Sequence, residues 1–170
     1  MAFWKPSITG EATGREPAGW QKFMARVFGT GFGTGYVPVG QGTAGSALFV
    51  LLWVLFVPEN IWWEVGVIVV AHVLSVITAG WGERMWGEDP GRITIDEFAG
   101  QAIALIAVPR AVIPVLLAFV LFRVFDTFKF PFVRKHIETL HGGWGVTLDD
   151  TLAGIFARVI MIAALAYLPI

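Results

Sequence analysis

The sequence predicts an all-α integral membrane protein, a compact bundle of about five transmembrane or partly re-entrant helices with an amphipathic helix at its N-terminus. Two observations support this prediction. Apolar residues make up 56% of the 170 residues and charged residues only 15%, whereas soluble domains average about 45–50% and about 25%. The apolar residues also gather in five segments, separated by short stretches with proline, glycine or charge.

The five apolar segments cover residues 44–57, 61–81, 98–108, 111–125 and 152–168. The second is about 31 Å long as a helix, enough to cross a bilayer core of about 30 Å. The third is only about 16 Å long, and Pro109-Arg110 separates it from the fourth. We therefore expect some of these helices to be tilted, broken or re-entrant.

Basic residues gather in the N-terminal tail and in residues 123–135. The positive-inside rule places both regions in the cytoplasm. The chain then crosses the membrane five times, with its C-terminus outside. Residues 1–22 are a polar tail, residues 23–170 form one membrane-embedded domain, and residues 20–28 have the pattern of a short helix on the membrane surface.

Composition also limits the partners and cofactors. The formal net charge is −1, and no basic run follows a phosphodiester backbone, so we expect no nucleic-acid partner. The chain has no cysteine, which excludes disulfides and thiolate metal sites.

Acidic residues from three separate segments fall at helix ends on the predicted cytoplasmic side. Acids at membrane depth are costly, so their convergence indicates a site. Clustered carboxylates are hard oxygen ligands, and Mg²⁺ is their natural occupant. The predicted metal ligands are Asp96, Glu97, Asp126, Asp149 and Asp150.

Helix capping is an alternative role for some of these acids. Thr94-x-x-Glu97 and Thr147-x-x-Asp150 both fit the capping box. Residues 93–97 and 146–150 also resemble each other, and each acidic pair is followed by Ala-Gly and an apolar helix. Two such helix starts can face each other across a site.

Basic residues accompany the acids. Arg123, Asp126 and Lys129 recur at helical spacing. They form either a salt bridge within one helix or a site in which Asp126 holds the metal while Arg123 and Lys129 hold phosphate oxygens. His141 opens a glycine loop over residues 142–145, which leads to the last acidic pair. It is a candidate general acid or phosphate contact, and Gly142 and Gly143 allow the backbone to approach a phosphate.

A glycine-rich stretch covers residues 29–46 and includes a G-x-G-x-x-G at residues 40–45. It is no dinucleotide fingerprint, because that motif needs a preceding strand and a βαβ unit, so we expect no nucleotide cofactor. The stretch opens a helix N-terminus, whose N–H groups suit a phosphate. Gly42 and Thr43 are the predicted phosphate contacts. In the alternative, Gly42, Gly45 and Ser46 only allow close helix packing.

Three further polar residues lie in or beside apolar segments. We expect His72 to be hydrogen-bonded inside the bundle and Glu64 to be solvated near the outer interface. Arg158 lies two turns into the last segment, where it either snorkels or supports Asp150.

Four stretches together resemble the phosphatidylglycerophosphatase A family of bacterial membrane lipid phosphatases: GFGTGYVPVGQGTAGS (31–46), IDEFAGQ (95–101), FRVFDTFK (122–129) and HGGWGVTLDDTLAG (141–154). The resemblance implies Mg²⁺-dependent hydrolysis of phosphatidylglycerophosphate to phosphatidylglycerol and phosphate at the cytoplasmic face. It also implies that the five acids are site residues, with Arg123, Lys129 and His141 beside them. The family's Pro-Gly-Thr reads Gln41-Gly42-Thr43 here, and its Lys-Pro-x-Pro reads Lys129-Phe130-Pro131-Phe132.

Two other classes of protein share parts of this pattern. A membrane transferase of the CDP-alcohol type has a similar size, metal and location, but its longer pattern of spaced aspartates is not found here. An ion-coupled carrier places its acids near the bilayer centre, whereas these acids lie at one interface. For the phosphatase, attack by water and an aspartyl-phosphate intermediate both remain open.

Overall fold

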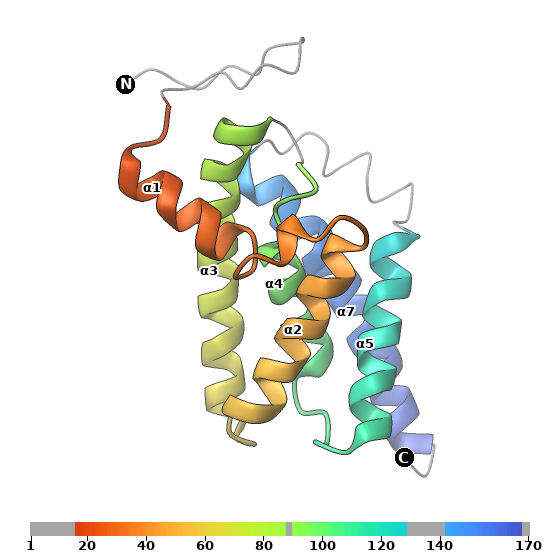
Figure 1. Cartoon of the computed structure of the whole chain (residues 1–170). Helices are drawn as coiled ribbons and strands as arrows, with labels where there is room; N and C mark the ends of the chain where they lie inside the picture. Colours follow the sequence, from red (N-terminus) through yellow and green to blue (C-terminus); the bar gives the residue numbers. More distant parts are fainter. Residues whose placement is uncertain (1–15, 88–89, 129–141, 168–170) are drawn as a thin grey trace.

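The computed structural model describes residues 16–87, 90–128 and 142–167, and its regular elements in these ranges are all helical (Figure 1). The α-helices are α1 (Gly19–Met24), α2 (Gln41–Phe56), α3 (Ile61–Trp86), α4 (Ile95–Leu105), α5 (Val112–Thr127) and α7 (Gly143–Tyr167). A π-helical turn (Ala25–Gly29) follows α1, and a 3-10 turn (Thr34–Tyr36) precedes α2. The prediction of an all-α fold is confirmed.

The five longer helices run alternately in opposite directions, so that α2, α4 and α7 begin at the end of the bundle where α3 and α5 finish (Figure 1). α1 lies at the same end and packs on α3, with the Trp20 and Trp81 rings 5.0 Å apart. The starts of α4 and α7 and the end of α5 therefore meet at one end, which brings the predicted acidic segments together.

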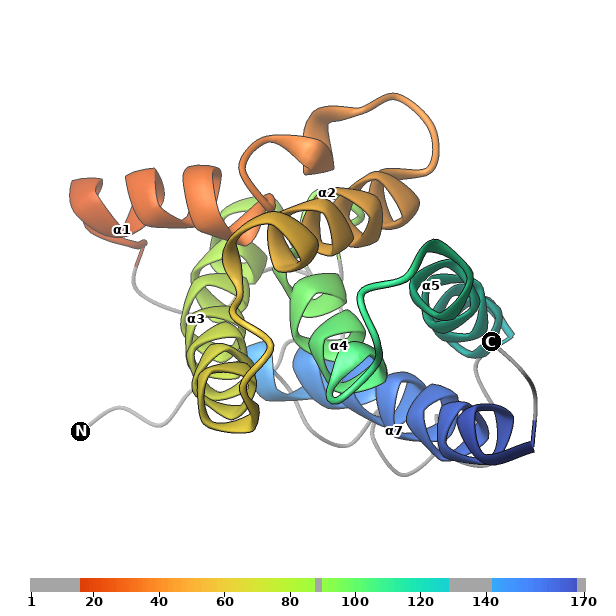
Figure 2. The same cartoon turned by 90° about the horizontal axis from the view of Figure 1, so that it is seen from below.

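The short helix α4 lies at the centre of the bundle. It contacts α2, α3, α5 and α7 (Figure 2), and nine of its 11 residues are buried. Its length is about 16 Å, shorter than a bilayer core. Since neighbouring helices surround it, α4 does not need to match the membrane in length.

Glycines bring the backbones of α4 and α7 into direct contact. A Cβ atom on Gly100 would overlap the carbonyl oxygen of Asp150, and one on Gly154 would overlap the carbonyl oxygen of Gly100. Small residues at such a crossing allow close packing of membrane helices. The two similar Ala-Gly pairs of the sequence are thus the contact between these helices, and this contact fixes the separation of Glu97 from Asp150.

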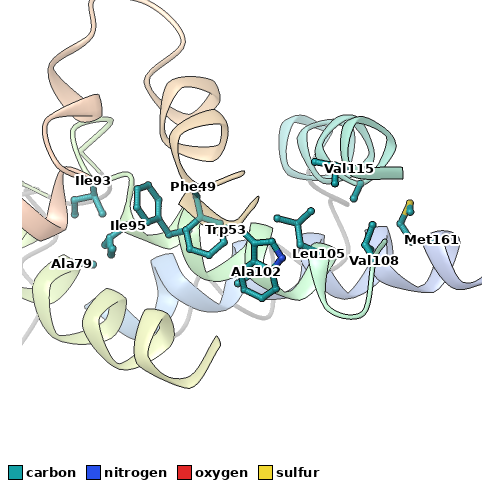
Figure 3. Close-up of a cluster of buried hydrophobic side chains, with 12 residues drawn as sticks. Phe49, Trp53, Ala79, Ile93, Ile95, Ala102, Leu105, Val108, Val115 and Met161 are labelled. Carbon is teal, nitrogen blue, oxygen red and sulfur yellow. The ribbon is translucent and has the colours of Figure 1, made fainter. Parts of the chain in front are cut away.

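The apolar core is a row of side chains that extends from Ile93 to Met161 (Figure 3). The Phe49 ring lies 5.1 Å from that of Phe98 and 5.7 Å from that of Trp53. The contact between Phe49 and Phe98 joins α2 to the buried face of α4.

By length and composition, α3 and α7 are each able to cross a membrane. Only 28% of the apolar window of each helix is buried, whereas the core helix of a soluble protein buries most of such a window. Large apolar side chains accordingly face outward on α3 and α7, including Val69, Val70, Val73, Val159 and Ile162. The number of crossings and the amphipathic role of residues 20–28 stay predictions.

Two predicted element boundaries are wrong. α3 continues through Trp86 instead of ending at Trp81, and α7 begins at Gly143, so residues 143–145 are helical and not a flexible loop. Gly143 is buried against α3, where a Cβ atom would overlap the Val76 carbonyl oxygen and lie 2.8 Å from the Gly80 nitrogen. This glycine therefore allows close helix packing and does not break the helix.

Glu64 is buried and not solvated as expected, with 3% of its surface exposed. Arg110 donates a hydrogen bond to it at 2.9 Å, and the Ala107 N–H donates another at 2.7 Å. α4 ends early, and Ala107 adopts a positive φ of 50°, so this N–H needs an acceptor outside its own helix. The expectation for His72 is confirmed, because its ring nitrogens lie 2.8 Å from the Ile68 carbonyl and 3.1 Å from the Thr151 hydroxyl.

Candidate active site

Three buried carboxylates from three helices meet at the α1 end of the bundle. Glu97 lies on the first turn of α4, Asp126 near the end of α5 and Asp150 two turns into α7. Each offers one carboxylate oxygen, and these oxygens lie within 4.8 Å of one another. We call these three residues the acid cluster.

Arg123 joins two members of the acid cluster. Its Nη1 donates to Glu97, and its Nη2 lies 3.1 Å from an Asp126 oxygen. The salt bridge that the Arg123–Asp126 spacing predicts within α5 is present, and the roles of these residues toward a metal and a phosphate stay predictions. The guanidinium is held on two sides and is positioned before any substrate arrives.

The formal charges of the acid cluster and Arg123, taken as the described residues of this site, do not balance. The acid cluster contributes three formal negative charges and Arg123 one positive charge, which leaves −3 + 1 = −2. Buried charge is costly unless it is paired or coordinates a metal. A divalent cation would balance this excess, and carboxylate oxygens are the ligands that Mg²⁺ prefers. The residues present therefore fit a magnesium ion.

The glycine-rich stretch lies directly beside the acid cluster, at the start of α2. A Cβ atom on Gly42 would overlap the Glu97 Oε1 and lie 3.2 Å from the Arg123 Nη1. Gly45 is buried against Thr94, and a Cβ atom on Gly45 would lie 3.1 Å from the Thr94 Cβ. The absence of side chains at these positions lets the first turn of α2 approach the ion pair.

Ser46 contributes a side chain that sequence reasoning assigned only to packing. Its hydroxyl lies 3.0 Å from Glu97 Oε2 and accepts a hydrogen bond from Arg123 at 3.2 Å. Ser46 follows Gly42 by four residues, so both lie on one helical face. This spacing is the signal that could have identified it.

Gln101 also has no predicted role. It follows Glu97 by one helical turn and is fully buried. Neither polar atom of its amide has a hydrogen-bond partner within the part of the chain that the structure describes. The polar face of α4 thus continues from the acid cluster toward the bundle interior.

Helix capping does not explain the two acidic pairs. Thr94 precedes α4 but makes no capping hydrogen bond among the described residues, and its hydroxyl lies 2.9 Å from that of Thr34. Thr147 lies inside α7 and donates to the Gly143 carbonyl at 2.6 Å. The capping-box interpretation is therefore wrong for both acidic pairs.

The other predicted site residues occupy different positions. Asp96 and Asp149 are half-buried and outside the acid cluster, and Thr43 is exposed. Gly142 and Gly143 lie at the start of α7, and Gly143 precedes Asp150 by about 10 Å along the helix axis. Lys129 and His141 lie outside the described residues. The metal and phosphate contacts assigned to these residues stay predictions.

We predict that Ser46→Ala lowers the rate of the reaction at this site about tenfold, the usual effect of removing a hydrogen bond to a charged group. Alanine keeps the packing but leaves Glu97 and Arg123 without the hydroxyl. Steady-state assays of Ser46→Ala and Thr43→Val show which hydroxyl of α2 serves the site. Wild-type kinetics in both variants would leave this part of α2 with a packing role only.

Comparison with known proteins reveals relatives that cover most of the chain. The model of the family Phosphatidylglycerophosphatase A matches residues 27–165. A Bacteroides thetaiotaomicron protein named "Putative phosphatidylinositol-3-phosphatase" is 38% identical over 150 residues, which cover 84% of this chain and 94% of the relative.

Two other relatives are named Phosphatidylglycerophosphatase A. The Escherichia coli protein is 33% identical over 137 residues, 77% of each chain. The Haemophilus influenzae protein is 34% identical over 141 residues, 78% of this chain and 83% of the relative. No solved structure matches the chain. The family model covers every residue of the acid cluster together with Arg123 and Ser46, and the chain belongs to the phosphatidylglycerophosphatase A family.

Proposed function

We propose that this protein is a Mg²⁺-dependent phosphoric monoester hydrolase that converts phosphatidylglycerophosphate to phosphatidylglycerol and phosphate. The observation that carries the proposal is the acid cluster held by Arg123, in a chain of the phosphatidylglycerophosphatase A family. Two of the relatives are named for this activity. The family membership supports the reaction class, and the charge imbalance of the site supports the metal.

Glu97, Asp126 and Asp150 would hold the magnesium ion. When bound, the ion supplies positive charge for the phosphate oxygens and activates a water molecule. Arg123 lies beside the same carboxylates, so a phosphate that reaches the acid cluster also reaches a guanidinium. Because Glu97 and Asp126 hold this guanidinium in place, little reorganisation is needed to stabilise the charge of the transition state.

The reaction breaks the bond between phosphorus and the glycerol oxygen. The attacking group is either water or an aspartate, which would give an aspartyl-phosphate. The leaving oxygen needs a proton, for which His141 is the predicted general acid. Rapid quenching during turnover distinguishes the two routes, because only the second accumulates a phosphoenzyme.

The proposed location is the bacterial inner membrane, with the acid cluster facing the cytoplasm. Outward-facing apolar side chains on α3 and α7 support contact with lipid. The cytoplasmic orientation follows from the basic residues of the N-terminal tail and of residues 123–135. The acid cluster lies at the end of the bundle where the phosphate groups of membrane lipids would meet it.

A second candidate substrate is phosphatidylinositol 3-phosphate, because the Bacteroides relative is named for its hydrolysis. Both lipids carry a phosphate monoester on a polyol headgroup, so the acid cluster serves either reaction. The discriminating contacts would involve the glycerol or inositol hydroxyls and not the phosphate.

Purified protein should release phosphate from phosphatidylglycerophosphate in mixed micelles when Mg²⁺ is present. Chelation should abolish the release, and added Mg²⁺ should restore it, because the site then regains its balancing charge. Equal concentrations of phosphatidylinositol 3-phosphate, assayed in parallel, compare kcat/KM for the two headgroups. Undiminished activity in chelator would overturn the metal requirement, and a higher kcat/KM for the inositol lipid would reassign the substrate.

A further inference from the structure

A second cluster of buried and half-buried side chains, three of them charged, lies at the end of the bundle opposite the acid cluster. It consists of Glu64 on the first turn of α3, Arg110 between α4 and α5, Arg158 on α7 and Trp53 near the end of α2. The end of α2 and the starts of α3 and α5 lie together at the end of the bundle away from α1 (Figure 1). The proposed hydrolysis uses none of these residues.

Glu64 is the carboxylate that pairs directly with this cluster, and both of its oxygens accept hydrogen bonds. Oε1 accepts from Arg110 Nη2 at 2.9 Å, and Oε2 accepts from the Ala107 N–H at 2.7 Å. The side chains of Glu64 and Arg110 are 4% and 10% exposed. The Arg110 guanidinium also lies over the Trp53 ring, 5.0 Å from its centroid.

The cluster has more donors than acceptors. Four buried nitrogen atoms have no hydrogen-bond partner among residues 16–87, 90–128 and 142–167: Arg110 Nε, Arg110 Nη1, Arg158 Nη1 and Trp53 Nε1. All of them are donors and none can accept. Buried donors without acceptors are costly, so this arrangement favours a ligand that brings oxygen atoms.

The charges point to the same kind of ligand. Arg110 and Arg158 are both attracted to the single buried carboxylate of Glu64, which gives +2 − 1 = +1. Glu59 also attracts Arg110, but it is exposed, and solvent screens its charge. An anion would therefore supply both the missing acceptors and the missing charge.

Neighbouring aromatic residues indicate the depth of this cluster in the membrane. Trp62 and Trp63 precede Glu64 on α3 and are 80% and 63% exposed. Exposed tryptophans of this kind lie at the level of lipid headgroups. Arginine is well suited to phosphate oxygens. We propose that Arg110 and Arg158 bind a phosphate-type oxyanion, from a lipid headgroup or free in solution, at a site separate from the acid cluster.

The experiment titrates purified full-length protein without divalent ions and follows its melting temperature in neutral detergent. One arm adds inorganic phosphate, and the other adds phosphatidylglycerol in mixed micelles. All proteins carry Arg123→Gln, which weakens phosphate binding at the acid cluster. Arg158→Gln is the test variant, because Arg110→Gln would also strand the Glu64 carboxylate. Arg158→Lys keeps the charge, and Arg84→Gln, at an exposed position on α3, is the matched control.

We expect the melting temperature to rise as ligand is added. The apparent Kd for the ligand, taken from this titration, should increase about tenfold or more in Arg158→Gln. Arg84→Gln should leave it unchanged, and Arg158→Lys should retain part of it. A response to phosphate would identify a free oxyanion, and a response to the lipid alone would identify a headgroup. Identical titrations with and without Arg158→Gln, or no response to either probe, would overturn the proposal and assign the donors to water. This outcome does not depend on hydrolysis.

Discussion

Asp150→Asn and Glu97→Gln should each lower phosphate release from phosphatidylglycerophosphate by about 10³-fold, the scale of losing a main electrostatic contact of the transition state. Each change removes one of three carboxylates whose oxygens lie within 4.8 Å of one another. The formal charge of the site becomes less negative, from −2 to −1, so the site binds a divalent cation more weakly. The measurement is kcat/KM at saturating Mg²⁺, with circular dichroism to show that the helices persist.

The neighbouring acids provide matched controls for these two variants. Asp149→Asn and Asp96→Asn make the same chemical change one residue earlier, at half-buried positions outside the acid cluster. A clearly smaller loss is expected from them. Losses as large as those of Asp150→Asn and Glu97→Gln would extend the metal site to all five acids. Full activity in Asp150→Asn would remove the acid cluster from the reaction.

Arg123→Gln should separate metal binding from turnover. Without the guanidinium, the three carboxylates keep a formal charge of −3, so Mg²⁺ should bind about tenfold or more tightly, as expected when a unit charge is removed near a divalent ion. The value of kcat should nevertheless fall about 10²–10³-fold, because a positioned group that stabilises the transferring phosphoryl charge is lost. Calorimetric titration with Mg²⁺ and initial rates at several Mg²⁺ concentrations measure the two effects.

Arg123→Lys is the control for charge alone. Lysine carries the same charge, but its single ammonium group does not reproduce the two-sided contact to Glu97 and Asp126. We expect its Mg²⁺ affinity to stay close to that of the wild type, while kcat falls by an intermediate factor. If Arg123→Gln left the Mg²⁺ affinity unchanged or weakened it, the ion would not lie among these carboxylates.

The sequence was sufficient to predict the all-α class and the meeting of acids from three segments. It could not separate Glu97 from Asp96 or Asp150 from Asp149. Neighbouring positions on a helix point about 100° apart, so the choice between them depends on where the facing helices lie. For Glu97, that direction is set by Ser46 and Arg123, which are 51 and 26 residues away along the chain.

The start of α7 shows how packing can override a local signal. Glycines at residues 142–145 favour a loop by propensity, yet the helix begins at Gly143. The cost of glycine in a helix is small compared with the gain from close contact between α7 and α3 at Val76 and Gly80. The glycines would predict a helix start and not a loop only if the position of α3 were already known.

The burial of Glu64 likewise depends on a distant partner. Its position near the end of an apolar segment is typical of a solvated acid. Arg110 is 46 residues away, and no local pattern links the two. Glu64 and Arg110 lie at ends of apolar segments on the same predicted side of the membrane, which only weakly indicates that they are paired. The pairing becomes predictable only when the early end of α4 is known.

The contact between Gly100 and Gly154 has a consequence for the permeability of the membrane. On the inner side of the acid cluster, the backbones of α4 and α7 touch, and the fully buried Phe122 ring packs against the same glycine. An ion or proton that reaches Glu97 and Asp150 therefore meets closely packed backbone and an aromatic ring along this seam. We therefore expect this seam to offer an ion no path through the bundle. In the proposed membrane orientation, a strongly acidic site would thus lie within a bundle of apolar helices without short-circuiting an ion gradient, as expected of a phosphatase and not of an ion-coupled carrier.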